Sequence, residues 1–111
     1  MKSCVPKMVI RGTYFHIAQC TECGRIGFCY RNLLLGFEKK VFIDWGKELM
    51  KKEFREHACL FPDGNPHIII DSCHFDIQFT FTEWEFEELC KVLFHGIMLI
   101  ETQDSVYRSM N

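Results

Sequence analysis

Alternating hydrophobic and polar positions in the first third of the chain predict β-strands. Three segments show this period of two: residues 13–20, 25–30 and 33–37. They contain aromatic and β-branched side chains, which favour a half-buried sheet surface. Arg31 and Asn32, between the last two segments, suit a tight turn, because Asn tolerates a positive φ angle. The three segments therefore predict an antiparallel meander.

Two longer segments repeat their apolar positions with the period of an α-helix. Between residues 38 and 57 the apolar stripe consists of Phe42, Trp45, Leu49, Met50 and Phe54. A second stripe follows later in the chain: Leu89, Val92, Leu93, Gly96, Ile97 and Ile100. Thr82 and Glu85 precede it with the spacing of a capping box, in which each side chain accepts a hydrogen bond from an N–H of the first helical turn. Both segments are expected to be amphipathic helices.

The region between the two predicted helices indicates a second hairpin. Residues 61–66 are dense in turn-forming residues. His67–Ile70 is a short apolar strand, and residues 71–74 predict a turn. Apolar side chains then alternate with polar ones at Phe75, Ile77, Phe79 and Phe81. We expect this hairpin to extend the sheet of the first three strands.

These elements predict a single α+β domain over residues 1–111. The expected order is βββ-α-ββ-α, with an antiparallel sheet of about five strands and two helices packed on one face. Residues 1–12 are expected to form a loosely held N-terminal arm, with no more than a short strand at Met8–Ile10. Residues 103–111 are expected to be a frayed C-terminal tail. With 111 residues the chain is long enough to bury a core without disulfide bonds.

Composition and charge narrow the class of protein. Hydrophobic residues make up 48% of the chain, charged residues 25%, and the net charge is −2, which gives no reason to expect a nucleic-acid or anionic-membrane partner. No apolar run approaches the roughly 18–20 residues of a membrane-spanning helix. The N-terminus lacks the apolar segment of a secretory signal. We therefore expect a soluble cytoplasmic protein whose seven cysteines stay reduced or bind metal.

Three of those cysteines lie in the stretch HIAQCTECGRIGFCYRNLLLGF, where Cys20-x-x-Cys23-Gly24 falls between two predicted strands. A tight turn of this kind directs two thiolates the same way and has the shape of a zinc knuckle. In such a knuckle the turn supplies two of the tetrahedral ligands of the zinc ion. His16 and Cys29 should face each other across the hairpin. They would lie roughly 13 Å from the turn, too far to share the ion.

The spacing of the residues does not identify the remaining zinc ligands. The candidates are Cys4, His57, Cys59, Cys73 and His74, and a second chain could instead contribute its own cysteine pair. The alternative without metal is a pair of reduced thiols at a tight turn. A redox or thiol-enzyme role for Cys20 and Cys23 is a further alternative, although dithiol redox motifs usually begin a helix. Cys90 falls within the second apolar stripe and is expected to pack in the core.

The same stretch resembles a family of small bacterial proteins found mainly in Bacteroidetes. Their pattern is a Cys-x-x-Cys-Gly hairpin, then an Asn followed by alternating apolar residues, and then a helix with paired Phe. The positions that carry the likeness are Cys20, Cys23, Gly24, Asn32, Leu33, Leu35, Phe37 and Phe42, together with the start of the last helix at Phe79–Glu85. The resemblance implies the hairpin fold and no particular activity.

The sequence as a whole therefore favours a non-enzymatic binding or interaction module with a zinc-knuckle-like turn, and zinc is its candidate cofactor. Trp84, Tyr107 and the surplus among eleven phenylalanines could form the aromatic self-association surface of a homo-oligomer, and packing in the core is the alternative use of most of them. The alternative function is a redox protein or thiol-dependent enzyme that uses Cys20 or Cys23.

Overall fold

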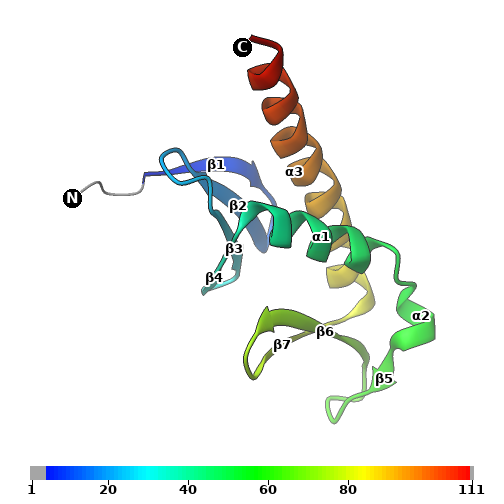
Figure 1. The fold of residues 1–111 in the computed structure, drawn as a ribbon. Coiled ribbons are helices and arrows are strands. Elements are labelled where there is room, and N and C mark those ends of the chain that lie inside the picture. Colours follow the sequence, from blue (N-terminus) through cyan, green and yellow to red (C-terminus); the bar gives the residue numbers. More distant parts are fainter. Residues whose placement is uncertain (1–4, 111) are drawn as a thin grey trace.

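The protein, seen in a computed structural model that describes residues 5–110 and the side chains of residues 5–104, has an α+β fold with two antiparallel sheets (Figure 1). The described strands are β1 Pro6–Arg11, β2 Phe15–Cys20, β3 Ile26–Tyr30, β4 Leu33–Phe37, β5 Cys59–Leu60, β6 Pro66–His74 and β7 Ile77–Phe81. The helices are α1 Lys39–Met50, α2 Phe54–His57 and α3 Glu83–Met110. The α+β class is confirmed, but the prediction of one five-stranded sheet is wrong.

The first sheet contains β1 to β4 in chain order. The predicted register of its central hairpin is confirmed: the amide of Cys20 donates to the carbonyl of Arg25 at 2.9 Å, and His16 lies opposite Cys29. Alternate side chains turn inward and are buried: Phe15, Ile17, Ile26, Phe28, Leu35 and Phe37. This alternation is the period of two expected of strands with one buried face.

The N-terminal segment is better ordered than its sequence suggests. Half of the expected arm forms β1, which pairs with β2 from Pro6 opposite Cys20 to Arg11 opposite His16. A bulge between Met8 and Ile10 shifts the register, so Ile10 lies opposite the inward-facing Ile17. The strand is hard to recognise from sequence because the bulge interrupts its alternation.

Helices α1 and α3 pack on the inner face of the first sheet. On α1, Phe42 contacts Phe28 and Phe37, at ring-centroid distances of 6.2 and 5.4 Å, while α3 contacts β1 and β2. The first predicted helix ends earlier than expected, at Met50 rather than near His57. The chain becomes extended at Glu53 and then forms the short α2, which buries Phe54. This bend allows Phe54 to pack against α3.

The second sheet has the order β5-β6-β7 and differs from the predicted hairpin in its turn. Strand β6 continues through the expected turn at residues 71–74, with a bulge between Asp71 and His74 and a positive φ of 64° at Cys73. The chain reverses later, at Phe75 and Asp76. Phe75 is therefore 92% exposed instead of joining the buried face that holds Phe79 and Phe81.

Aromatic rings join the two sheets into one core. Phe79 meets Phe28 at 5.8 Å, and Phe81 meets Tyr30 at 5.1 Å and Phe15 at 5.6 Å, all edge to face. Such pairs contribute about 0.5–1.5 kcal/mol each beyond the area that they bury. The second sheet therefore covers the core of the first instead of extending it.

Helix α3 begins at the predicted capping box. The carboxylate of Glu85 accepts hydrogen bonds from the amide of Thr82 at 2.9 Å and from its hydroxyl at 3.0 Å, so the Thr hydroxyl donates here rather than accepting. The helix continues to Met110, through most of the expected tail, and its last turns extend beyond the sheets (Figure 1). Among the described residues, no helix combines the length and apolar character needed to cross a membrane.

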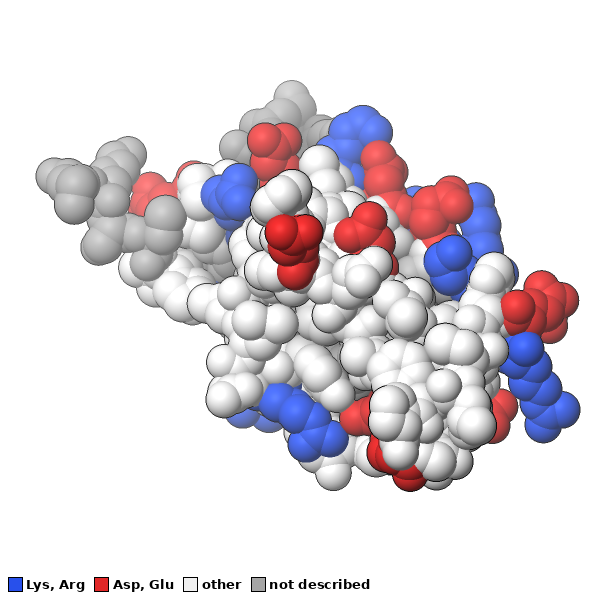
Figure 2. Space-filling view, turned by 90° about the horizontal axis from the view of Figure 1, so that it is seen from below, with Lys and Arg blue, Asp and Glu red and all other residues white. Residues whose placement is uncertain are grey.

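Charged side chains are interspersed rather than gathered. Lys40 pairs with Asp44 on α1 at 2.9 Å, and Lys51, directly after α1, pairs with Glu48 at 3.1 Å. The face seen from below is largely uncharged, with Lys, Arg, Asp and Glu mixed around it (Figure 2). Neither sign forms a continuous patch on that face.

Candidate metal centre

The cysteine pair lies at the tip of the β2–β3 hairpin, as predicted. Strand β2 ends at Cys20, and the chain turns through Cys23 without opening a helix. The amide of Gly24 donates to the carbonyl of Cys20 at 3.0 Å, and Gly24 has a φ of 77°. Only glycine adopts this left-handed conformation without strain from a side chain. Gly24 therefore closes the turn that brings the second cysteine back toward the first.

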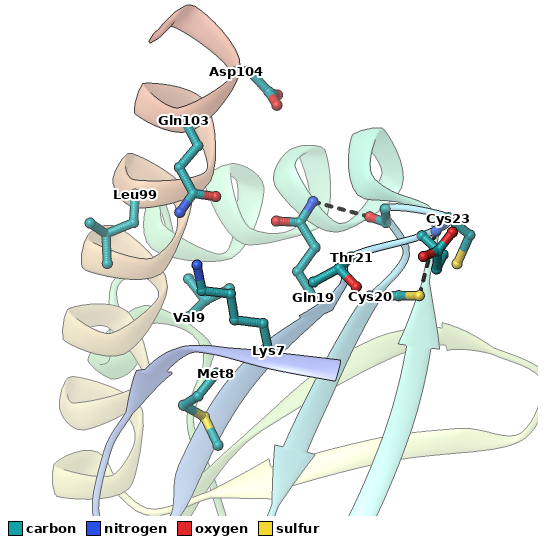
Figure 3. A pocket seen from close by; sticks show the side chains of 12 residues that line it. Lys7, Met8, Val9, Gln19, Cys20, Thr21, Cys23, Leu99, Gln103 and Asp104 are labelled. Atoms are coloured by element: carbon teal, nitrogen blue, oxygen red, sulfur yellow. Dashed lines mark hydrogen bonds between the residues drawn. The ribbon is translucent and has the colours of Figure 1, made fainter. Parts of the chain in front are cut away.

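A backbone hydrogen bond joins the two cysteines. The amide of Cys23 donates to Sγ of Cys20 at 3.4 Å, and Figure 3 shows the two side chains close together at the end of the hairpin. Cysteine binds metal as the thiolate. The hydrogen bond from the Cys23 amide places the Cys20 sulfur at the turn, beside the second cysteine.

Neighbouring residues brace the turn from both sides. The side-chain amide of Gln19 donates to the carbonyl of Gly24 at 3.2 Å. On the other side, the amide and the hydroxyl of Thr21 donate to the carbonyl of Val5 at 3.1 and 3.3 Å. These bonds connect the turn to the residue that precedes β1 and to its own strand. A braced turn loses little conformational entropy when a ligand binds.

The two cysteines differ in exposure. Cys23 is exposed, but only 9% of Cys20 is accessible. An open groove of about 610 Å³ lies beside them, between β1, the turn and the C-terminal half of α3. Its lining includes Lys7, Leu99 and Asp104 (Figure 3). A ligand from solvent therefore reaches the site from the side of Cys23.

The other described candidate ligands lie on other elements. His57 ends α2, Cys59 begins β5, and Cys73 and His74 lie at the end of β6. Within residues 5–104, no three His, Cys, Asp or Glu side chains are grouped so that they could hold a metal ion. None of these four residues therefore joins the cysteine pair in this structure. Cys4 lies outside the described residues.

His74 contacts the backbone with both of its ring nitrogens. Nδ1 lies 2.9 Å from the carbonyl oxygen of Ser72, and Nε2 lies 2.9 Å from that of Gly36. The ring also packs edge-on against Phe37 at 5.1 Å. Gly36 belongs to the edge strand β4, so His74 joins the two sheets and covers an edge carbonyl. Its nitrogens are occupied by the fold and are not directed at a metal.

Two further cysteines are poor candidates for thiol chemistry. Burial, and then the nearby Glu87 carboxylate, raise the pKa of Cys90 to about 11. Cys90 is half-buried against the core, as expected from its place in the apolar stripe. Burial and the Asp71 carboxylate also raise the pKa of Cys73. Since the thiolate is the nucleophile, neither residue is activated.

A second polar cluster lies at the other end of the same hairpin. The Arg31 guanidinium sits 4.2 Å above the Tyr14 ring and donates to Glu85 at 3.2 Å. The Tyr30 hydroxyl donates to the same carboxylate oxygen at 2.9 Å, and Trp84 packs against Tyr14 at 5.4 Å. These groups are paired with each other and connect the β3–β4 turn to α3. Their partners are more than fifty positions apart in the chain, so no local pattern reveals them.

A hydroxyl, an imidazole and a carboxylate form a third polar chain. His67 Nδ1 lies 2.7 Å from Thr80 Oγ1, and His67 Nε2 lies 2.8 Å from Asp63 Oδ2. Phe61 stacks on the imidazole at 4.4 Å. Hydrogen bonds from the Asn65 amide and then from His67 lower the pKa of Asp63. This chain fastens the loop before β6 to β7.

Comparisons with known proteins identify no relative. No family model matches the sequence, no curated protein matches it significantly, and no solved structure matches the fold.

Proposed function

We propose that this chain is a non-enzymatic binding module whose Cys20-x-x-Cys23 turn binds a structural zinc ion. The observation that carries this proposal is the hydrogen bond from the Cys23 amide to Cys20 Sγ, in a turn closed by Gly24. Zinc binds thiolate ligands, and the two cysteines of this closed turn would supply two of them. The ion would fix the end of the hairpin beside β1.

Cys4 is our candidate for the third ligand. It directly precedes Val5, whose carbonyl is bonded to the amide and hydroxyl of Thr21 within the turn. Cys4 itself lies outside the described residues, so its role as a ligand rests on this sequence neighbour. Three thiolates would leave one position of a tetrahedral ion for a ligand from outside this set. A second chain contributing its own cysteines is the alternative.

Structural binding of zinc explains the turn better than redox chemistry does. The described chain continues from Cys23 into β3, so the helix N-terminus that activates thiols in dithiol redox motifs does not follow it. Cys29, Cys59, Cys73 and Cys90 form no disulfide in the structure, which fits a reducing compartment such as the cytoplasm. We also propose that this chain belongs to the bacterial family that its hairpin resembles.

Metal analysis of protein purified without chelator tests the proposal. We expect about one zinc ion per chain, and its loss in Cys20→Ser and Cys23→Ser. Cys59→Ser is the matched control, because Cys59 is exposed on another element, and it should retain the metal. If Cys4 is a ligand, Cys4→Ser should also lower zinc occupancy.

Thiol titration of the same preparations separates the two functions. Bound zinc should protect Cys20 and Cys23 from alkylation until a chelator removes it. A metal-free protein in which one of these thiols reacts unusually fast would contradict the zinc proposal and support a thiol-dependent activity instead.

A further inference from the structure

Helix α3 has a second apolar surface on the side away from the core. Its inner side buries Leu89, Val92, Leu93, Ile97 and Ile100. On the outer side, Phe94 is 56% exposed and Met98 is 47% exposed. Helix α1 flanks this side through Lys47 and Met50 but leaves both side chains about half exposed. Two large apolar side chains one helical turn apart form a patch on which another surface can pack.

The charged residues that flank this patch have a specific spacing. Lys91 lies three positions before Phe94, and Glu101 lies three positions after Met98. The positions 91, 94, 98 and 101 alternate steps of three and four, which is the spacing of the contact seam in a two-helix coiled coil. We call these four residues the outer seam. It has an apolar centre, a positive end and a negative end.

We propose that the outer seam of α3 pairs with the outer seam of a second copy of this chain, with the two helices antiparallel. In that arrangement Phe94 of each copy faces Met98 of the other. The same register places Lys91 of each copy opposite Glu101 of the other. The pairing is isologous, because one two-fold axis generates both halves of the contact.

Charge selects this arrangement over the parallel one. A parallel pair in register would place Lys91 against Lys91 and Glu101 against Glu101, and both contacts are repulsive. In the antiparallel pair both contacts are attractive. Glu101 already accepts a bond from Lys47 of α1 at 3.0 Å, so its carboxylate would lie between two lysines.

Helix α1 adds to the same surface. A shallow hollow beside the seam is lined by Lys47, Met50, Phe94, Ile97, Met98 and Glu101, and it offers a place for an apolar side chain of the second copy. The self-association surface expected at Trp84 and Tyr107 is different: Trp84 packs on Tyr14, and the Tyr107 side chain lies outside the described residues. The pairing does not depend on zinc.

Analytical ultracentrifugation at protein concentrations that span about a hundredfold range tests the pairing. The wild-type chain should change reversibly from monomer to dimer, while Phe94→Glu and Met98→Glu should remain monomeric. Leu60→Glu is the matched control, since Leu60 is equally apolar and exposed on β5, and it should dimerise like the wild type. Circular dichroism would confirm that all variants fold.

Charge exchange tests the direction of the helices. Lys91→Glu and Glu101→Lys should each weaken dimerisation, because each variant faces like charges in its own homodimer. An equimolar mixture of the two variants should regain the dimer, since both contacts of the mixed pair are then attractive. A wild-type chain that stays monomeric, a Phe94→Glu variant that dimerises normally, or a mixture no stronger than its components would each overturn the proposal.

Discussion

Glu85 shows how one side chain connects two parts of the fold. Burial on its own raises the pKa of Glu85, but hydrogen bonds from the Thr82 amide, the Tyr30 hydroxyl, the Thr82 hydroxyl and Arg31 outweigh it. Together they hold the pKa below its ordinary value of 4.5. A lowered pKa in the folded state means that the ionised carboxylate stabilises the protein at neutral pH.

Replacing that carboxylate should therefore have a pH-dependent effect. We expect Glu85→Gln to lower the free energy of unfolding by about 1–3 kcal/mol at pH 7, the usual range for losing hydrogen bonds to a charged group. The contribution is complete above the unfolded pKa near 4.5. It is lost as pH falls through the lower folded pKa, so the difference from the wild type should shrink in acid.

Urea unfolding at a series of pH values measures this effect. Glu87→Gln on the same helix, where the side chain is exposed, is the control and should change stability little at any pH. A difference between Glu85→Gln and the wild type that stays constant from neutral to acidic pH would show that the charge contributes nothing.

Sequence reasoning finds only the local half of this network. The capping-box spacing correctly predicts that Glu85 accepts from the Thr82 amide. It cannot predict Tyr30 and Arg31, which come from a distant turn. In that turn Arg31, not Asn32, has the positive φ, at 55°. The guanidinium contacts with Tyr14 and Glu85 offset the backbone cost, so a tertiary contact overrides the local preference of Asn.

At the scale of elements, the close approach of α3 to the β1–β2 turn depends on Gly12. A Cβ atom at this position would lie 2.8 Å from Val92 Cγ2 and 2.9 Å from the carbonyl oxygen of Phe15. The Gly12 amide already bonds that carbonyl at 2.7 Å, so the backbone cannot move away without losing the bond. The turn and the helix fit together only without a side chain here.

We therefore expect Gly12→Ala to destabilise the protein by about 1–3 kcal/mol, the usual cost of overpacking. The matched control is Gly36→Ala, where the nearest atom, Arg25 Nη2, is an ordinary 3.4 Å from the new Cβ. That substitution should change stability by no more than about 0.5 kcal/mol. Thermal or denaturant unfolding measures both, and equal stabilities for the two variants would contradict the packing explanation.

Periodicity predicts the type of these elements better than their ends. The apolar stripe of the first helix correctly includes Phe42, Trp45 and Leu49, but it does not show that the chain bends before Phe54. Strand β6 passes through the expected turn because its bulge is stabilised by tertiary contacts. Trp45 Nε1, from another element, donates to the carbonyl of Asp71 at 2.6 Å. A local sequence pattern cannot indicate such a contact between distant residues.

At the scale of the whole molecule, alternation identifies strands but not their partners. The second hairpin shows its buried face clearly in sequence, at Phe79 and Phe81. Nothing in that pattern distinguishes extending the first sheet from covering it. The structure places Phe79 and Phe81 against Phe28, Tyr30 and Phe15, and such contacts between layers are set by the packing of the complete core.

Only part of the candidate metal site can be predicted from the sequence. The hairpin, its register and the position of Cys20 and Cys23 follow from consecutive strands and a short loop, so the sequence predicts them. A ligand set drawn from separate elements depends on how those elements pack, and His57, Cys59, Cys73 and His74 are directed elsewhere by the second sheet.

X-ray absorption at the zinc edge, on protein purified without chelator, tests the central claim most directly because it reports the ligand atoms themselves. If the Cys20–Cys23 turn holds the ion, the first shell should be dominated by sulfur at about 2.3 Å, and this signal should disappear in the Cys20→Ser, Cys23→Ser double variant. Zinc bound only by nitrogen and oxygen at about 2.0–2.2 Å, or a wild-type protein that retains no zinc, would contradict the claim.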